Sequence, residues 1–156
     1  MNKPVRKRNR LKDYDYSTNG YYFITICSKD KNKTFGSISN PEQNYTKYSK
    51  LGFIIEKHIL NIEKHYDDVR INKYVIMPNH VHMIVVIGCN DNNRVEKHSL
   101  SIIVGQFKAG VTKEARATVW QRNFHDHIIR TQEDYERIWR YIDANPALWY
   151  KDCFFD

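Results

Sequence analysis

The chain has 156 residues, of which 25 are lysine or arginine and 18 are acidic, and its formal net charge is +7. This length suits one compact domain over residues 1–156, and the 11 tyrosines, 7 phenylalanines and 3 tryptophans argue against intrinsic disorder. The sequence contains no run of 18 apolar residues, which argues against a membrane-spanning helix.

The first twelve residues predict a basic, flexible arm with six cationic side chains: Lys3, Arg6, Lys7, Arg8, Arg10 and Lys12. A basic arm on a basic domain favours a polyanionic partner, most simply nucleic acid, although a solvated tail explains the charge equally well. The arm lacks the apolar stretch of a secretory signal, and the three cysteines are too far apart for a zinc knuckle. An odd number of free cysteines suits a reducing environment, so we expect a cytoplasmic protein.

The first half of the chain predicts three strands and one helix. Residues 20–28, GYYFITICS, are rich in the aromatic and β-branched residues of a strand, and residues 29–44 have the composition of an exposed hairpin or loop. The apolar residues over 50–65 have helical spacing, which predicts an amphipathic helix. Residues 69–77 and 80–88 are two further strands, and the Pro-Asn turn between them predicts an antiparallel hairpin.

The second half predicts a helix, a short strand and a last helix. Ser99 or Ser101 is expected to cap the first of these helices, whose apolar face is Leu100, Ile103, Val104, Phe107 and Val111. Residues 118–121, TVWQ, predict a short strand, which residues 127–130 extend less clearly. A capping box at Thr131 and Asp134 starts the last helix, and Pro146 ends it near Asn145. Its apolar stripe is Tyr135, Ile138, Trp139 and Ile142.

The element order is therefore β α β β α β, followed by one helix. This order predicts an α+β, ferredoxin-like (RRM-like) fold, in which an antiparallel sheet has two helices on one face. The other face would be open, and the C-terminal helix is available to cover it.

Two histidines in the strand over 80–88 need an explanation, because a buried polar group without a partner costs about 1–3 kcal/mol. His80 and His82 alternate with Val81, so their side chains lie on one face of the sheet, about 7 Å apart along the strand. Two imidazoles in this arrangement can bind one divalent metal ion. The alternative is two histidines that are hydrogen-bonded independently, and the short motif alone favours it.

A second pair, His125 and His127, has Asp126 between its members and lies next to the last helix. It could form a rival metal site, a phosphate contact or an exposed connection. We favour a contact or a connection, because an apolar residue between the ligands is what anchors a ligand-bearing strand in a core.

On the last helix, Tyr141 and Asn145 are i, i+4 neighbours on a shared face beside the apolar stripe. A phenol and an amide oxygen at these positions could face a metal ion held by the sheet. The ordinary alternative is a partly exposed tyrosine on an amphipathic helix.

The segments YVIMPNHVHMIVV (74–86) and VWQRNFHDHIIRTQEDYERIWRYIDANPALW (119–149) together resemble the REP-associated tyrosine transposases. These proteins belong to the single-tyrosine HUH superfamily and are related to the transposases of single-stranded insertion sequences. RNRLKDYDYSTNGYYFITICS (8–28) also resembles the start of this family, so the resemblance covers nearly the whole chain.

The resemblance implies a role for each matching residue: His80 and His82 as metal ligands, Asn145 as the residue that completes the metal site, and Tyr141 as the nucleophile. It also implies a ferredoxin-like fold and a divalent metal, Mg²⁺ or Mn²⁺. The implied substrate is single-stranded DNA with hairpins, either repetitive palindromic elements or transposon ends. The implied reaction is cleavage next to the hairpin, which leaves a 5′-phosphotyrosine link and a free 3′-OH, by a monomer or a homodimer.

Several DNA contacts are expected from charge alone: Arg6, Lys7, Arg8, Arg10 and Lys12 in the arm, and Arg122 and Arg130 in the second half. Two alternatives stay open. One is another HUH endonuclease, such as a replication initiator or relaxase. The other is a non-catalytic or domesticated nucleic-acid-binding module, in which both histidines and Tyr141 are structural. The apolar C-terminal segment after Pro146 is expected to dock on the domain or on a partner.

Overall fold

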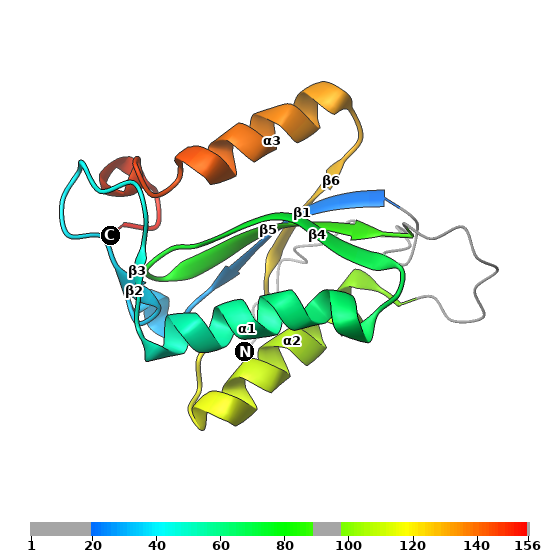
Figure 1. Ribbon diagram of the computed structural model, residues 1–156, viewed down its shortest axis with the longest axis horizontal. Helices are drawn as coiled ribbons and strands as arrows, with labels where there is room; N and C mark the ends of the chain where they lie inside the picture. The colour runs from blue at the N-terminus through cyan, green and yellow to red at the C-terminus, as the bar shows by residue number, and fades with distance from the viewer. Residues whose placement is uncertain (1–19, 89–97, 156) are drawn as a thin grey trace, which may run out of the picture.

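A computed structural model of the chain describes residues 20–88 and 98–155. Its centre is a four-stranded sheet of β1 (Gly20–Cys27), β4 (Val69–Ile76), β5 (His80–Ile87) and β6 (His125–Ile129) (Figure 1). The strand order is β4-β5-β1-β6, and every neighbouring pair is antiparallel. This order and the chain connections are those of the predicted ferredoxin-like fold.

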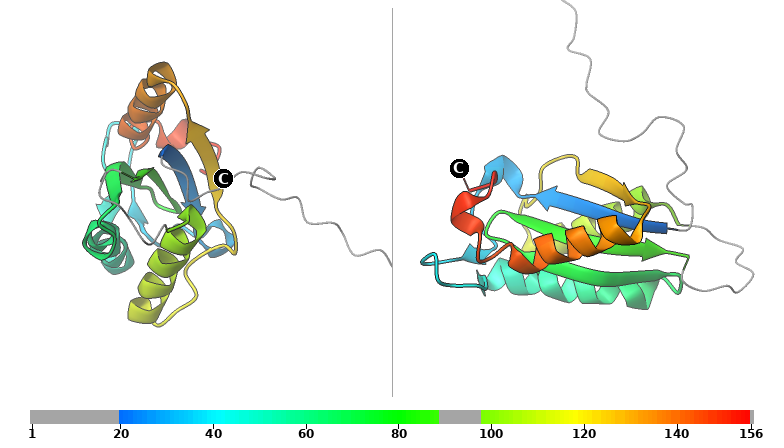
Figure 2. Two further views of the ribbon diagram at one scale, coloured as in Figure 1. Left: turned by 90° about the vertical axis from the view of Figure 1, so that its right-hand side faces the viewer. Right: turned by 90° about the horizontal axis from the view of Figure 1, so that it is seen from above.

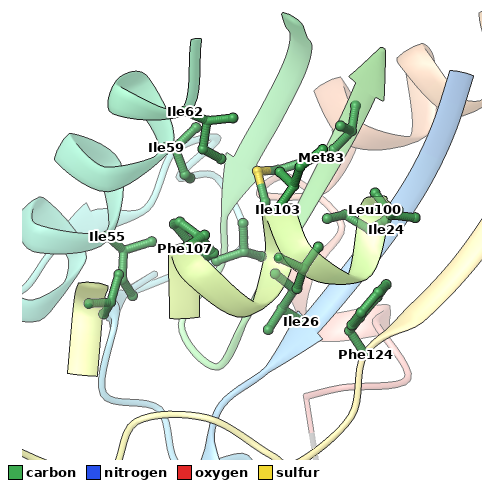
Figure 3. Packing of buried hydrophobic residues seen from close by; sticks show 14 of the residues in the cluster. Ile24, Ile26, Ile55, Ile59, Ile62, Met83, Leu100, Ile103, Phe107 and Phe124 are labelled. Carbon is green, nitrogen blue, oxygen red and sulfur yellow. The ribbon is translucent and has the colours of Figure 1, made fainter. Parts of the chain in front are cut away.

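Two helices cover one face of the sheet: α1 (Lys50–His65) and α2 (Leu100–Ala115). α1 has the predicted bounds, and α2 begins after Ser99, whose side chain accepts a hydrogen bond from the amide of Ile102. The main core lies between these helices and the sheet, where side chains such as Ile59 and Phe107 pack against Ile24 and Met83 (Figure 3). Alternate residues of β1 and β5 face this core, which leaves the intervening residues for the opposite face.

The opposite face carries α3 (Gln132–Ala144), as Figure 2 shows. The Thr131 hydroxyl accepts a hydrogen bond from the amide of Asp134, which confirms the predicted helix start. Ile138 and Ile142 are buried in a second core cluster with Ile84, Val86 and Ile129. The predicted apolar stripe is wrong at Trp139, which is 36% exposed. Trp139 lies beyond the edge of the contact between α3 and the sheet, and the Lys73 ammonium is 4.5 Å from its ring centroid.

The predicted strand over 118–121 is also wrong. Trp120 forms one isolated bridge with Ser28, and the regular strand β6 starts only at His125. The reason is that Val119 and Trp120 are buried in the main core, where the Trp120 ring lies 5.2 Å from that of Phe35. The segment therefore packs as an irregular connection before the chain rejoins the edge of β1.

The remaining elements are short. After β1 come the 3-10 helix η1 (Lys29–Lys31) and a small hairpin of β2 (Gly36–Ser37) and β3 (Lys47–Tyr48), in line with the predicted loop or hairpin. The chain ends with η2 (Trp149–Lys151), whose Trp149 is buried against the domain. Within the described ranges, no helix is long and apolar enough to cross a membrane.

Candidate active site

His80 and His82 are the first and third residues of β5, and both side chains point to the sheet face that carries α3. They are 0% and 1% exposed, and their ring centroids lie 4.6 Å apart. The alternation of the strand thus brings the two rings together, as the sequence predicts. Although both rings are buried, each has a polar partner on one nitrogen.

The Nδ1 atoms provide these contacts. His80 Nδ1 lies 2.8 Å from Asn79 Oδ1, and His82 Nδ1 lies 2.8 Å from Thr25 Oγ1. The amide nitrogen of Asn79 donates to the carbonyls of Lys31 and Phe154, so the Asn79 oxygen is the acceptor and His80 Nδ1 is the donor. In a neutral imidazole this leaves the Nε2 lone pair of His80 free for a metal ion.

Both imidazoles are neutral near pH 7. Burial lowers the pKa of His80 to about 4, although the Asp152 carboxylate and the nearby Asn145 side chain both favour the charged form and oppose the change. Burial and the neighbouring His80 charge hold the pKa of His82 well below its usual 6.5. Neutral imidazole is the form that binds metal ions.

The C-terminal half of α3 brings Tyr141 and Asn145 to the histidines. The Tyr141 ring lies 5.3 Å from that of His82 and 6.1 Å from that of Phe23, and it is 42% exposed. Asn145 caps the helix, is 2% exposed, and donates from its side-chain amide to the Tyr141 carbonyl at 3.2 Å. The shared face predicted for these two residues is therefore the face turned toward β5.

Three buried polar atoms in this region have no hydrogen-bond partner among the described residues: His80 Nε2, His82 Nε2 and Asn145 Oδ1. Leaving such atoms unpaired is unfavourable, and two imidazole nitrogens with an amide oxygen form a suitable ligand set for a divalent cation. In the described ranges, no group of three His, Cys, Asp or Glu side chains could hold a metal. The candidate ligand set at this position is the two histidines with the amide oxygen of Asn145.

The phenol of Tyr141 is protonated at neutral pH. Burial raises its pKa above the usual 10, hydrogen bonding from Asn145 opposes this rise, and the nearby charge of Asp152 adds to it. A tyrosine in this state needs to lose its proton as it attacks an electrophile.

The C-terminal segment also contacts the site. The Phe154 ring lies 4.4 Å from that of His80, and Asp152 Oδ2 lies 3.9 Å from His80 Nε2. Asn79 donates to the Phe154 carbonyl at 2.6 Å, and Trp149 is 2% exposed. The segment thus docks on its own domain, which is one of the two predicted outcomes. The position of Asp152 was not predicted, because a single acidic residue in a short tail gives no local signal.

The second histidine pair lies on the edge strand β6, which β1 separates from the first pair on β5. Both side chains are exposed, and Thr25 is the strand partner of His125. His127 Nε2 lies 2.5 Å from Asp134 Oδ2, so His127 connects β6 to the first turn of α3. This contact agrees with the predicted connection and gives no support to a rival metal site.

Of the predicted DNA contacts, the structure describes only Arg122 and Arg130, and no contact of either with the histidines is seen in the described residues. Arg6, Lys7, Arg8, Arg10 and Lys12 lie outside the described residues. Arg122 is exposed in the connection before β6, where its carbonyl accepts from Lys108. Arg130 is exposed after β6 and lines a cleft with Tyr21 and Tyr135. This cleft is at the far end of the sheet, since Tyr21 lies near the start of β1 whereas Cys27, paired with His80, ends it.

Comparisons with known proteins agree with this arrangement. An uncharacterised protein of Haemophilus influenzae is 39% identical over 167 residues, which cover 94% of this chain and 91% of that protein. A second Haemophilus influenzae protein, named "Putative REP-associated tyrosine transposase", is 26% identical over 85% of this chain and 73% of its own length. No model of a known protein family matches the chain.

Two solved structures share the fold. The structure of a REP-associated tyrosine transposase bound to a REP hairpin has a TM-score of 0.65 at 19% identity, over 88% of this chain and 72% of that one. The crystal structure of a "putative transposase" from Deinococcus radiodurans has a TM-score of 0.51 at 12% identity, over 86% of this chain and 95% of that one.

The fold is α+β and ferredoxin-like, and solved transposase structures share it. The chain belongs to the same family as the Haemophilus influenzae protein with 39% identity. The resemblance to REP-associated tyrosine transposases that the motifs indicate is confirmed, and it supports a transposase function.

Proposed function

We propose that the chain is a single-tyrosine HUH transposase that nicks and rejoins single-stranded DNA next to hairpins. The observation that carries this proposal is the contact between Tyr141 and His82, whose ring centroids lie 5.3 Å apart. Within the described residues His82 Nε2 is buried without a hydrogen-bond partner. A half-exposed phenol therefore lies beside a nitrogen that suits a metal ion.

In this proposal His80, His82 and Asn145 hold a divalent cation, Mg²⁺ or Mn²⁺. When bound, such an ion offsets the negative charge of a phosphodiester and makes its phosphorus a better electrophile. Thr25 and Asn79 orient the two rings through their Nδ1 atoms. The choice of Mg²⁺ or Mn²⁺ rests on the family resemblance, since this ligand set also suits Zn²⁺ or Ni²⁺.

Tyr141 acts as the nucleophile. Its phenolic oxygen bonds to phosphorus as the bond from phosphorus to the 3′ oxygen of the preceding nucleotide breaks. The phenol loses its proton, and the leaving oxygen takes one to become a 3′-OH. The 5′-phosphotyrosine retains the energy of the phosphodiester. A 3′-OH can therefore attack it in the reverse direction and join two strands.

The proposed substrate follows from the relatives, one of which is described as bound to a REP hairpin. We extend this to a hairpin with a single-stranded flank for the present chain. The formal net charge of +7 favours such a polyanion, and the arm, Arg122 and Arg130 are proposed phosphate contacts.

The test is covalent capture. A labelled library of single-stranded DNA hairpins with short flanks is incubated with the full chain and Mn²⁺ or Mg²⁺, then resolved on a denaturing protein gel. We expect a protein–DNA band that disappears with EDTA and in Tyr141→Phe. Tyr45→Phe is the matched control, since Tyr45 is 61% exposed on the loop between β2 and β3, and it should keep the band.

Three results would overturn or change the proposal. DNA binding without any covalent band would indicate a binding-only module. A band that survives both His80→Ala and Tyr141→Phe would show that the site is assigned wrongly. A band that is insensitive to EDTA would remove the metal from the mechanism.

A further inference from the structure

The segment that follows β1 carries three exposed lysines within five residues: Lys29, Lys31 and Lys33. The first of them, Lys29, is two residues after Cys27, whose partner across the strands is His80. We propose that this lysine turn, residues 29–33, binds phosphates of the single-stranded DNA substrate at the edge of the candidate active site. This proposal rests on the proposed function, because it names the part of the chain that would hold the DNA strand beside the candidate active site.

Asn79 joins the lysine turn to the candidate metal site. Its side-chain oxygen contacts His80 Nδ1, and its amide nitrogen donates to the Lys31 carbonyl at 3.3 Å. Its own carbonyl accepts from the amide of Ser28 at 2.9 Å. Buried Asn79 thus contacts the His80 ring, the residue before the turn and the middle residue of the turn, so a phosphate held by the lysines would lie near the histidines.

The lysine turn also lies beside the C-terminal segment, as Figures 1 and 2 show. The Lys33 ammonium lies 4.2 Å from the ring centroid of Phe155. Burial raises the pKa of the Cys153 thiol, and the Lys31 charge opposes that rise. This effect agrees with a position of Lys31 beside the C-terminal segment. Lys29 and Lys31 form no ion pair with any other residue in the described part of the chain, so their charges are available to an anion.

The backbone of the turn is strained at two positions. Asp30 and Lys31 have φ angles of 55° and 56°, in the left-handed region that favours glycine. Hydrogen bonds hold this conformation, from Ser28 Oγ to the Asn32 carbonyl at 2.7 Å and from the Asn32 amide to the Lys29 carbonyl at 3.1 Å. A turn that only linked two strands would be more stable with glycine at these positions. Lysine at position 31 therefore indicates a use for its side chain.

The number of charges favours a polymer as the ligand. Three separate ammonium groups suit a strand with one negative charge per nucleotide better than one small anion. Lysine also binds phosphate as a point charge without reading the base, so the turn would contribute affinity and position rather than sequence specificity.

The strained turn allows a sharp test, because stability and binding should respond differently. In a full chain that carries Tyr141→Phe, Lys31→Gly relieves strain and removes a charge, whereas Asp30→Gly relieves similar strain and keeps all three lysines. We expect neither variant to lower the melting temperature. Binding is measured by fluorescence anisotropy with a labelled thymidine oligonucleotide, and with a hairpin that has single-stranded flanks.

Lys31→Gly should weaken binding about fivefold near 0.1 M salt and reduce the slope of log K against log salt by about 0.7, the contribution of one phosphate contact on single strands. Asp30→Gly should bind at least as well as the parent, and Lys31→Arg should restore the slope. Equal affinity and slope in Lys31→Gly and the parent would overturn the proposal. So would inorganic phosphate that binds at Lys31 while DNA affinity stays unchanged, which would indicate a small-anion site.

This measurement is separate from the covalent test. Binding in the Tyr141→Phe background needs no cleavage, so a chain that never forms an adduct can still show the lysine contribution. Conversely, covalent capture by the native chain with no loss on Lys31→Gly would keep the proposed function and reject the lysine turn.

Discussion

Asn79 Oδ1 accepts a hydrogen bond from His80 Nδ1 at 2.8 Å, and this contact decides which nitrogen of the ring faces the site. The amide nitrogen of Asn79 is engaged by the carbonyls of Lys31 and Phe154, so the amide cannot turn over without losing both bonds. The orientation of one proposed metal ligand therefore depends on a buried amide at the turn between β4 and β5.

Replacing Asn79 should weaken metal binding. We expect Asn79→Ala to lower Mn²⁺ affinity about 10- to 100-fold, as is usual when the partner of a metal-binding histidine is lost. Titration calorimetry measures this, with Asn72→Ala as the control, since the Asn72 side chain donates to the Tyr135 hydroxyl, in the first turn of α3 and away from Tyr141. Equal affinity in Asn79→Ala and the native chain would show that the hydrogen bond does not serve a metal ligand.

The free energy of unfolding should fall as the pH drops below about 6.5. In the unfolded chain both histidines titrate near 6.5, whereas burial holds the pKa of His80 at about 4 and that of His82 well below 6.5. Between these values the unfolded state binds protons that the folded state does not. Each histidine then lowers the free energy of unfolding by up to about 1.4 kcal/mol per pH unit. Above about pH 7 neither histidine contributes to the pH dependence.

Urea unfolding without metal, measured from about pH 7 to pH 5, tests this pH dependence. His82→Gln should show a shallower loss of stability than the native chain, and His65→Gln, at an exposed position near the end of α1, should not. The same pH dependence in all three proteins would contradict the assignment of neutral, buried imidazoles.

Substitutions of Tyr141 and Asn145 should affect covalent capture and metal binding differently. Tyr141→Phe is expected to remove covalent capture while stability changes by less than about 0.5 kcal/mol, because the side chain is 42% exposed. Asn145→Ala should lower metal affinity and also cost about 1 kcal/mol, since the helix end loses a donor to the Tyr141 carbonyl. Full Mn²⁺ affinity in Asn145→Ala would exclude its amide oxygen as a ligand.

His127 should prove structural. Its ion pair with Asp134 is half exposed, so His127→Ala should cost at most about 1 kcal/mol of stability and leave Mn²⁺ affinity unchanged. His82→Ala is the comparison and should abolish Mn²⁺ binding. The reverse pattern in calorimetry would move the metal site to the second histidine pair.

Sequence patterns predicted the elements whose signals are local. The helix starts at Ser49, Ser99 and Thr131 are each marked by a side chain that accepts a backbone hydrogen bond, and only the last two were identified as caps. Strand alternation placed His80 and His82 on one face. Helical spacing placed Tyr141 and Asn145 together, but only the packing of α3 on that face brings them to the histidines.

The errors and omissions came from contacts between distant parts of the chain. A short run such as 118–121 does not distinguish a strand from an irregular segment, and burial of Trp120 in the core decided the outcome. Trp139 has the spacing of a core residue, yet it lies at the edge of the sheet, where the Lys73 ammonium is placed over its ring. The approach of Asp152 and Phe154 to His80 joins the end of the chain to its middle, and no local pattern encodes it.

The most direct test of the account is to locate the covalent bond. After reaction of the native chain with a hairpin DNA and Mn²⁺, nuclease and protease digestion followed by mass spectrometry identifies the peptide that carries the remaining nucleotide. The account predicts a nucleotide 5′-phosphate on the Tyr141 hydroxyl. An adduct on another residue, such as Tyr150, or cleaved DNA with no protein adduct, would contradict it.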